Sequence, residues 1–305
     1  GYDNTKSAPT RTVRGGNGND NATEGQGMTG NAILRHDIMS TLPKTILDDL
    51  GCVEGKTSWQ KRRSALEAVQ NACTSVGYSI EYNKALINLL RSVKSRLTDT
   101  QANLKPLAMQ VMGALMSSLD TRSVVKAMPV VGQAIFVGTG DGKKSMQEAA
   151  ISALHCIAYG DPSASQSSIE SKTADPTLLS SLLLPMSEAL ANPVGRLGLL
   201  QWLLQHASTV TKSTVGNLDL APALVGALQD KQAPVRSVAE NVLQQICANG
   251  AITAIALENA TRDLSAAVRS SMKGALTKCI EATQTQPLST TSGSDKKETT
   301  DVSVP

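Results

Sequence analysis

Apolar residues recur at helical spacing through the middle of the chain, from about residue 35 to residue 283. The stretches come in pairs separated by Gly, Pro or polar residues, which end helices. We find no good alternating strand pattern and no Asn-Gly hairpin signal. The first pair has its apolar positions at Ile38, Leu42, Ile46, Leu47 and Leu50, then at Trp59, Ala65, Leu66, Val69 and Cys73. The pattern predicts an all-α fold.

A turn and the helix that follows it recur four times in related form. Relative to an Asp, each copy has an apolar residue five positions later, a polar or basic residue six later and an apolar residue nine later. The copies read D-T-Q-A-N-L-K-P-L-A from Asp99, D-G-K-K-S-M-Q-E-A-A from Asp141, D-K-Q-A-P-V-R-S-V-A from Asp230 and D-L-S-A-A-V-R-S-S-M from Asp263. Such recurrence at a few tens of residues is typical of a repeat array.

The spacing of the paired stretches gives the size of the repeat. The second helix of each pair is expected to begin near residues 58, 104, 144, 194, 234 and 264, so the steps are about 46, 40, 50, 40 and 30 residues. HEAT and armadillo units are roughly 40 to 47 residues long, and a shorter last step suits a terminal cap. The sequence therefore predicts twelve helices in six antiparallel pairs, an α-solenoid of six HEAT-like helical hairpins.

Both ends of the chain differ in composition from the middle. Residues 1–32 and 285–305 are rich in Gly, Asn, Ser, Thr and charged residues and have little to bury, so they are expected to be disordered linkers. The domain is expected to span 33–284. A polar segment from Gly160 to Pro176 divides it into a front half, about 33–158, and a rear half, about 176–284. Because the chain begins with Gly, we interpret it as a piece of a longer polypeptide.

Composition narrows the functional classes. Hydrophobic residues make up 41% of the chain but aromatic residues only 2%, which favours closely packed helices with small aliphatic side chains. A net charge of +3 is too weak to indicate nucleic acid. No apolar run approaches the roughly 20 residues of a membrane helix. The five widely spaced cysteines contain no C-x-x-C pair, so we expect reduced thiols in a cytoplasmic protein and neither a metal site nor a cofactor.

The recurring turn combines structural positions with positions that can bind. The Asp residues are expected to cap helices by accepting backbone N–H groups. The basic residue six positions later is either a solvated cation, held near an Asp or the next repeat, or a ligand contact. Because the turns within the pairs of a solenoid emerge along one edge, they would form a mostly basic ridge that suits an acidic partner. Its members are Trp59, Lys61, Arg62, Lys143, Lys144, Arg196, Lys231 and Arg236.

The two tryptophans have different surroundings. Trp59 follows Lys56, Thr57 and Ser58 and precedes Gln60 and Lys61, so it is either folded back on the core or a binding anchor. Trp202 lies in an apolar run and is expected to belong to the core.

Three segments resemble the TOG domains of the XMAP/Dis family of microtubule polymerases. They are W-Q-K-R-R-S-A-L-E-A-V from Trp59, S-R-L-T-D-T-Q-A-N-L from Ser95 and N-P-V-G-R-L-G-L-L-Q-W-L from Asn192, and the last is most like the fourth TOG domain of the array. The sequence departs from the family pattern at Lys56, where an Asp is usual, and at Gly195, where an apolar residue is usual.

The resemblance implies a paddle-shaped, non-catalytic domain, monomeric as a fragment, that binds αβ-tubulin through its turns, with Trp59 on β-tubulin and the rear-half basic residues toward α-tubulin. It also implies location on microtubules and at the centrosome or spindle pole. The tubulin-binding residues it implies are Trp59, Lys61, Arg62, Gln101, Asn103, Lys143, Lys144, Asn192, Arg196, Lys231 and Arg236.

Two other functions compete with tubulin binding. A HEAT-repeat adaptor for another protein, such as a phosphatase scaffold or a transport receptor, would have the same fold. An enzyme has little support, because the three His residues are far apart and G-T-G-D-G from Gly138 lacks the strand and the Lys-Ser/Thr of a phosphate loop. His155 and His206 lie on apolar helix faces, where satisfied core residues are expected. We therefore expect no catalytic residue.

Overall fold

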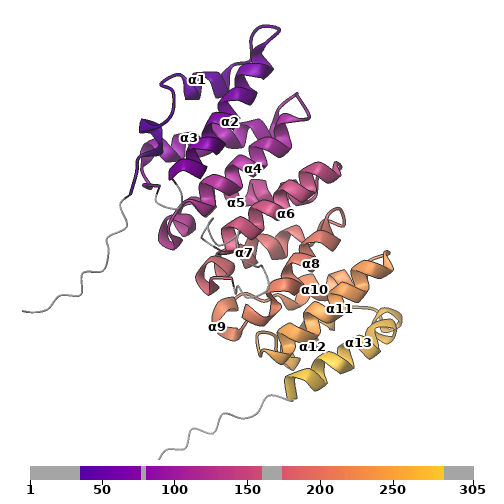
Figure 1. Ribbon diagram of the computed structural model, residues 1–305. Helices are drawn as coiled ribbons and strands as arrows, with labels where there is room; N and C mark the ends of the chain where they lie inside the picture. Colours follow the sequence, from indigo (N-terminus) through magenta and orange to yellow (C-terminus); the bar gives the residue numbers. More distant parts are fainter. Residues whose placement is uncertain (1–34, 77–79, 160–173, 285–305) are drawn as a thin grey trace, which may run out of the picture. The chain divides into compact units, whose positions relative to one another are not determined.

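The computed structural model describes residues 35–76, 80–159 and 174–284 (Figure 1). Within these ranges the chain forms thirteen α-helices and a few short 3-10 turns, and its only strand-like feature is an isolated bridge between His36 and Ile80. The all-α prediction is therefore confirmed. The predicted linkers and most of the polar segment after Gly160 lie outside the described residues, so the domain boundaries remain predictions.

The helices alternate between two layers of a solenoid. The first helices of the hairpins are α1 (Ile46–Gly51), α3 (Lys84–Ser95), α5 (Thr121–Thr139), α7 (Pro176–Ala189), α10 (Ala221–Leu228) and α12 (Ala254–Thr261). The second helices are α2 (Ser58–Val76), α4 (Leu104–Ser117), α6 (Lys144–Tyr159), α8 (Arg196–His206), α11 (Ala233–Ala248) and α13 (Ala266–Gln284). These second helices begin within two residues of the predicted positions, and each packs on the second helix of the next repeat.

The described chain has one helix more than the twelve predicted. Helix α9 (Lys212–Val215) packs against α7 before the fifth hairpin begins. It is too short to show a helical period in the sequence, which explains why the pattern did not predict it. The fourth repeat is also unusual, because α7 packs mainly on α5 and α8 mainly on α11. The six-hairpin solenoid is otherwise as predicted.

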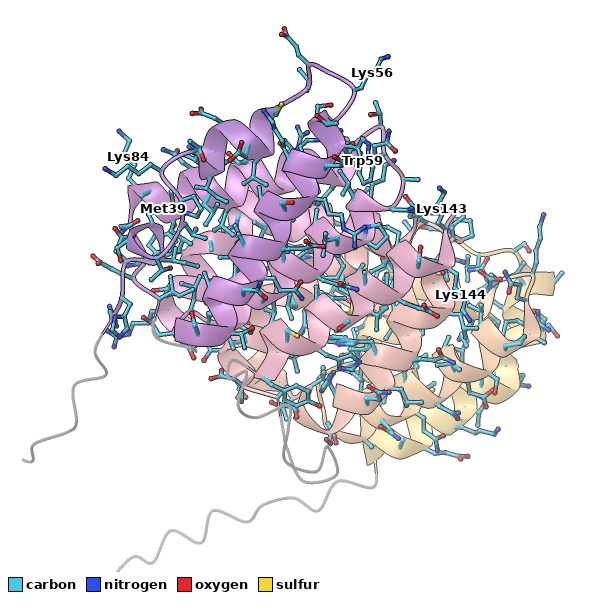
Figure 2. The ribbon with its side chains drawn as sticks, turned by 45° about the horizontal axis from the view of Figure 1, so that its top comes forward. Met39, Lys56, Trp59, Lys84, Lys143 and Lys144 are labelled. Carbon is cyan, nitrogen blue, oxygen red and sulfur yellow. The ribbon has the colours of Figure 1, made fainter. Side chains whose placement is uncertain are left out.

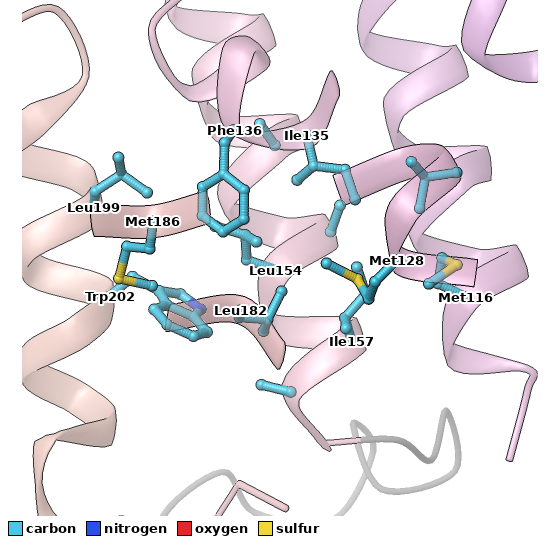
Figure 3. Close-up of a cluster of buried hydrophobic side chains, with 14 of the residues drawn as sticks. Met116, Met128, Ile135, Phe136, Leu154, Ile157, Leu182, Met186, Leu199 and Trp202 are labelled. Carbon is cyan, nitrogen blue, oxygen red and sulfur yellow. The ribbon is translucent and has the colours of Figure 1, made fainter. Parts of the chain in front are cut away.

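Small residues allow the second-layer helices to approach each other closely. A Cβ atom added to Gly113 of α4 would lie 2.9 Å from the Cα atom of Ala153 in α6. Elsewhere Leu, Ile, Met and a few larger side chains fill the space between the layers, as Figure 3 shows around Phe136, Leu154 and Trp202. This packing accounts for the low aromatic content. Among the described helices, none is long and apolar enough to cross a membrane.

Trp202 belongs to the core, as predicted, and it lies in a cluster of rings between α6 and α8. Its ring centroid is 4.5 Å from that of His206, and the rings of His155 and His206 are 5.6 Å apart. His206 is buried, but its Nε2 atom and the Nε1 atom of Trp202 have no hydrogen-bond partner in the described chain. His206 therefore lies in the core, as predicted, but within the described chain its Nε2 atom is not satisfied, because its aromatic neighbours there make ring contacts and no hydrogen bond.

Acidification is expected to weaken the fold through His206. Burial, together with the nearby His155, lowers the pKa of His206 from 6.5 to about 4. Between these values the unfolded chain binds the proton and the folded chain does not, so stability falls as the pH drops from about 6.5 toward 4, by on the order of 3 kcal/mol. Urea unfolding at pH 7 and pH 4.5 measures this loss. His206→Phe should flatten the dependence, and an equally steep curve in that variant would contradict the assignment.

Candidate functional site: the edge of intra-repeat turns

The six segments that connect the first and second helices of the hairpins form the turn edge. We define it as residues 52–57, 96–103, 140–143, 190–195, 229–232 and 262–265. Figure 2 shows Lys56, Trp59, Lys143 and Lys144 on this side of the molecule, whereas Met39 and Lys84 lie at the opposite helix ends. Direct contacts join the first turn to the second, the third to the fourth and the fourth to the fifth.

A buried ion pair links the first turn to the second. Arg62 donates from Nε to Oδ2 of Asp99 over 2.8 Å and from Nη2 to Oδ1 over 3.0 Å. Its Nη1 donates to the Cys52 carbonyl oxygen, at the end of α1. The side chains of Arg62 and Asp99 are only 5% and 1% exposed. Arg62 is therefore fully engaged within the protein, with every nitrogen of its guanidinium group donating to a neighbour.

Asp99 is the centre of this arrangement. Besides Arg62, it accepts hydrogen bonds from the Gln101 backbone N–H (2.8 Å) and from Nη1 of Arg96 (3.1 Å). Burial alone would raise the pKa of Asp99, but the Gln101 N–H and the two guanidinium groups together hold that pKa below its usual value of 3.8. The carboxylate is therefore ionised at neutral pH and fixes the first two turns relative to each other.

The fourth and fifth turns are joined in the same way. Arg196 pairs through Nη1 with Oδ2 of Asp230 at 2.5 Å, and it donates to the carbonyl oxygens of Leu190 (2.8 Å) and Ala191 (2.9 Å). Arg236 donates from Nη1 to the backbone carbonyl oxygen of Asp230 over 2.8 Å. In the Arg62–Asp99 and Arg196–Asp230 pairs, an arginine near the start of one second helix binds the Asp in the turn of the next repeat.

The third and fourth turns meet backbone to backbone. Gly195 has φ of +77°, and a Cβ atom added to it would lie 1.8 Å from the Thr139 carbonyl oxygen. On the other side, a Cβ atom on Gly140 would lie 2.7 Å from Nδ2 of Asn192. Only glycine combines this conformation with this close approach. The departure from the family pattern at Gly195 thus has a structural cause.

The recurring Asp residues act inside the turns. Asp99, Asp141 and Asp230 each accept from the backbone N–H two residues later, over 2.8 to 2.9 Å. The predicted carboxylate–N–H bonds are present, but the N–H groups lie just before the helices and not in their first turns. In the sixth turn the hydroxyl of Ser265 accepts from the Val268 N–H (3.3 Å). The repeated Asp therefore shapes the turn that presents its neighbours.

The structure places the predicted residues at or next to this edge, but they differ in burial and in hydrogen bonding. Trp59 is half-buried, packs against the core and also lines a recess of about 410 Å³ between the first two turns, so it is partly folded onto the core, and its role as a binding anchor remains a prediction. Arg62 and Arg196 are committed to their ion pairs. The remaining predicted residues are exposed: Lys61, Gln101, Asn103, Lys143, Lys144, Asn192, Lys231 and Arg236.

Sequence reasoning left two basic residues of the sixth repeat out of the site. Arg262 and Arg269 are both exposed at the last turn and extend the basic ridge. Arg269 stands six positions after Asp263, the same offset as Arg236 from Asp230, so the repeat pattern could have identified it. Among the described residues, no group of three or more His, Cys, Asp or Glu side chains could hold a metal ion.

These features define a HEAT-type helical solenoid whose turns lie along one edge, together with basic residues at the starts of the second helices. In fold the chain is similar to Drosophila melanogaster Mini spindles TOG3, with a TM-score of 0.51, 15% identity, and 78% of this chain and 95% of that chain covered. It is also similar to a structure from a study of microtubule plus-end tracking by XMAP215, CLIP-170 and EB1, with a TM-score of 0.55, 18% identity, and 82% and 96% covered. The predicted TOG fold is confirmed.

Two curated proteins are similar in sequence. Protein MOR1 of Oryza sativa subsp. japonica is 25% identical over 245 residues, or 80% of this chain, and Centrosomal protein 224 of Dictyostelium discoideum is 25% identical over 215 residues, or 70%. The chain spans 11% and 10% of the lengths of these relatives. The sequence matches no protein-family model. The fold and these relatives together confirm the resemblance to the TOG domains of microtubule polymerases.

Proposed function

We propose that this chain is a non-catalytic TOG domain that binds αβ-tubulin through the turn edge, within a larger regulator of microtubule polymerization at plus ends. The observation that carries the proposal is the turn edge itself, where exposed Lys61, Lys143, Lys144 and Lys231 lie in or just after the turns of the first, third and fifth repeats of a TOG-type solenoid. The names of the relatives support a cytoplasmic location on microtubules and at the centrosome or spindle pole. Similarity to the fourth TOG domain remains a prediction.

The contacts divide the predicted residues into two roles. Arg62 and Arg196 are positioning residues, because their guanidinium groups hold one turn against the next. Trp59, Gln101 and Asn103 offer contact surface on the front half, toward β-tubulin, whereas Asn192, Lys231 and Arg236 offer it on the rear half, toward α-tubulin. Modest contacts spread along a rigid edge suit a large protein partner better than a small ligand.

Reversing the charge of the third turn is expected to weaken tubulin binding. Lys143 and Lys144 are exposed, and Lys144 is held only by a long pair with Glu148 at 3.4 Å. The double variant Lys143→Glu/Lys144→Glu should bind purified αβ-tubulin roughly tenfold more weakly at low salt, because rim charges steer association, and the difference should shrink at high salt. Size-exclusion chromatography and fluorescence titration measure the effect.

Exposed lysines at the opposite helix ends provide a control of equal charge. Lys84 and Lys126 are exposed at the far side from the turn edge, so Lys84→Glu/Lys126→Glu changes the net charge by the same amount. This variant should bind tubulin like the wild type. Equal losses in both variants would mean that net charge alone matters, and a wild-type domain that retains no tubulin would favour an adaptor for another protein.

A further inference from the structure

A recess lies beside the turn edge, between α5 and α7. It has a volume of about 210 Å³, far more than the space one water molecule needs. Its lining combines apolar and polar side chains from the ends of both helices with residues of the third and fourth turns: Gln133, Phe136, Val137, Thr139, Gly140, Pro185, Glu188, Ala189 and Asn192. The recess is therefore continuous with the turn edge at the place where the two turns meet.

One exposed aliphatic side chain lines this recess, and two more lie close in sequence to residues of its lining. Val137 lines it and is 68% exposed, although it lies in an otherwise well-packed helix. Leu184, also exposed, lies one helical turn before Glu188, a residue of the lining. Val194 is exposed two residues after Asn192, and its carbonyl oxygen faces Gly140. Apolar side chains that gather around a hollow, unlike scattered ones, indicate an interaction site.

The floor of the recess is rigid. Phe136 and Thr139 are buried, and the Thr139 hydroxyl donates to the Phe136 carbonyl oxygen over 2.7 Å. Asn192 is held over Gly140, with its Oδ1 accepting from the Val194 N–H at 3.0 Å. Because the backbone contact at Gly195 fixes the two turns relative to each other, a partner would find the hollow already formed. Such preorganisation lowers the entropic cost of binding.

The charges around the recess indicate what kind of partner segment could bind there. Lys143 is the last residue of the turn that contributes Gly140, and Lys144 begins the helix after it. Neither lysine lines the recess, whose single acidic group is Glu188. A large apolar side chain therefore matches the hollow itself, and acidic residues that flank this side chain match the lysines of the third turn. Anchors of this type, near the centre of an interface, contribute much of the binding energy.

We propose that this recess is an anchor pocket for one aliphatic or aromatic side chain on an acidic segment of the tubulin dimer that binds the turn edge. The inference rests on the proposed function. The recess lies between the third and fourth of six turns, so it is at the middle of the edge, whereas the predicted site contains only turn residues and residues of the second helices. Val137, which is outside that predicted set, becomes a determinant of affinity.

The test uses a substitution that leaves the net charge unchanged. Val137→Gln should weaken binding of purified αβ-tubulin roughly tenfold, because the apolar contact of one valine side chain is lost. The loss should persist at high salt, unlike that caused by changing Lys143 and Lys144. The control is Ile255→Gln, since Ile255 is a β-branched residue that is 70% exposed in α12, at the helix end away from the turn edge.

Each outcome separates this inference from the proposed function. Weaker binding by Val137→Gln at both salt concentrations, with Ile255→Gln and the melting temperatures unchanged, supports the pocket. Wild-type affinity in Val137→Gln overturns the pocket and leaves tubulin binding by the turn edge intact. If the wild-type domain retains no tubulin at all, the proposed function is wrong, and the pocket falls with it.

Discussion

Replacing Arg62 with alanine is expected to lower the free energy of unfolding by about 3 to 5 kcal/mol, because it leaves the Asp99 carboxylate buried without its main partner. Arg62 supplies two of the hydrogen bonds to Asp99, and both side chains are almost fully excluded from solvent. Truncation also frees the Cys52 carbonyl oxygen at the end of α1. Urea unfolding followed by circular dichroism at neutral pH measures the loss.

The neighbouring arginine is a matched control. Arg63 is 58% exposed and pairs with Glu67 four residues later on the same helix, an interaction worth only about 0.5 kcal/mol or less. Arg63→Ala should therefore unfold close to the wild type. Because Asp99 has a lowered pKa, the stability it contributes is present above its ordinary pKa and is lost as the pH falls through the lowered one. Equal urea midpoints for Arg62→Ala and Arg63→Ala at neutral pH would refute the stabilising role of the Arg62–Asp99 pair.

The hairpins could be predicted because each helix buries one regular stripe. In α3, for example, Leu86, Leu89, Leu90 and Val93 are all fully buried, and they stand at the helical spacing read from the sequence. The repeated turn gave the register of the array for a similar reason. Asp99, Asp141 and Asp230 make the same local bond, which depends only on residues two positions apart. Local chemistry of this kind is contained in the sequence.

Contacts between repeats could not be predicted in the same way. The copies place a polar or basic residue six positions after each Asp, and this spacing suggests bonds within one turn. The buried partner of Asp99 is instead Arg62, 37 residues earlier, and that of Asp230 is Arg196, 34 residues earlier. Which arginine reaches which Asp depends on how far consecutive repeats rotate and slide. A single sequence therefore identified the charged residues but did not separate those that hold the turns from those exposed to a partner.

The recess beside α5 could not be predicted from the sequence either. Val137 belongs to a run of small and aliphatic residues, A-I-F-V-G from Ala134, in which Ile135 and Phe136 are buried and Val137 is not. Which side of the helix end remains open is determined by the distance between α5 and α7 near Pro185. That distance is a property of the stacked fold, and the order of residues along α5 contains no information about it.

Gly195→Ala is expected to lower the free energy of unfolding by at least about 3 kcal/mol, since two separate costs combine. An alanine at φ of +77° is strained, and its Cβ atom would lie 1.8 Å from the Thr139 carbonyl oxygen, so the third and fourth turns must move apart. The movement would displace Asn192 from Gly140 and disturb both the turn edge and the recess beside it. Tubulin binding should therefore weaken even at temperatures where the variant remains folded.

Gly216→Ala separates the two costs. Gly216 also has a positive φ, +59°, but no atom lies within 4 Å of the position its Cβ would take. With ψ of −119°, Gly216 lies outside the left-handed helical region, so this control should lose only backbone strain energy, about 1 to 3 kcal/mol, and should bind tubulin like the wild type. Thermal melting measures the stability of both variants, and titration with tubulin measures their affinity. If Gly195→Ala lost no more than about 1 to 2 kcal/mol, the strain of a left-handed residue alone, the contact between the third and fourth turns would be able to relax freely. The turn edge would then consist of two independently moving halves, and a preformed recess between α5 and α7 would no longer follow.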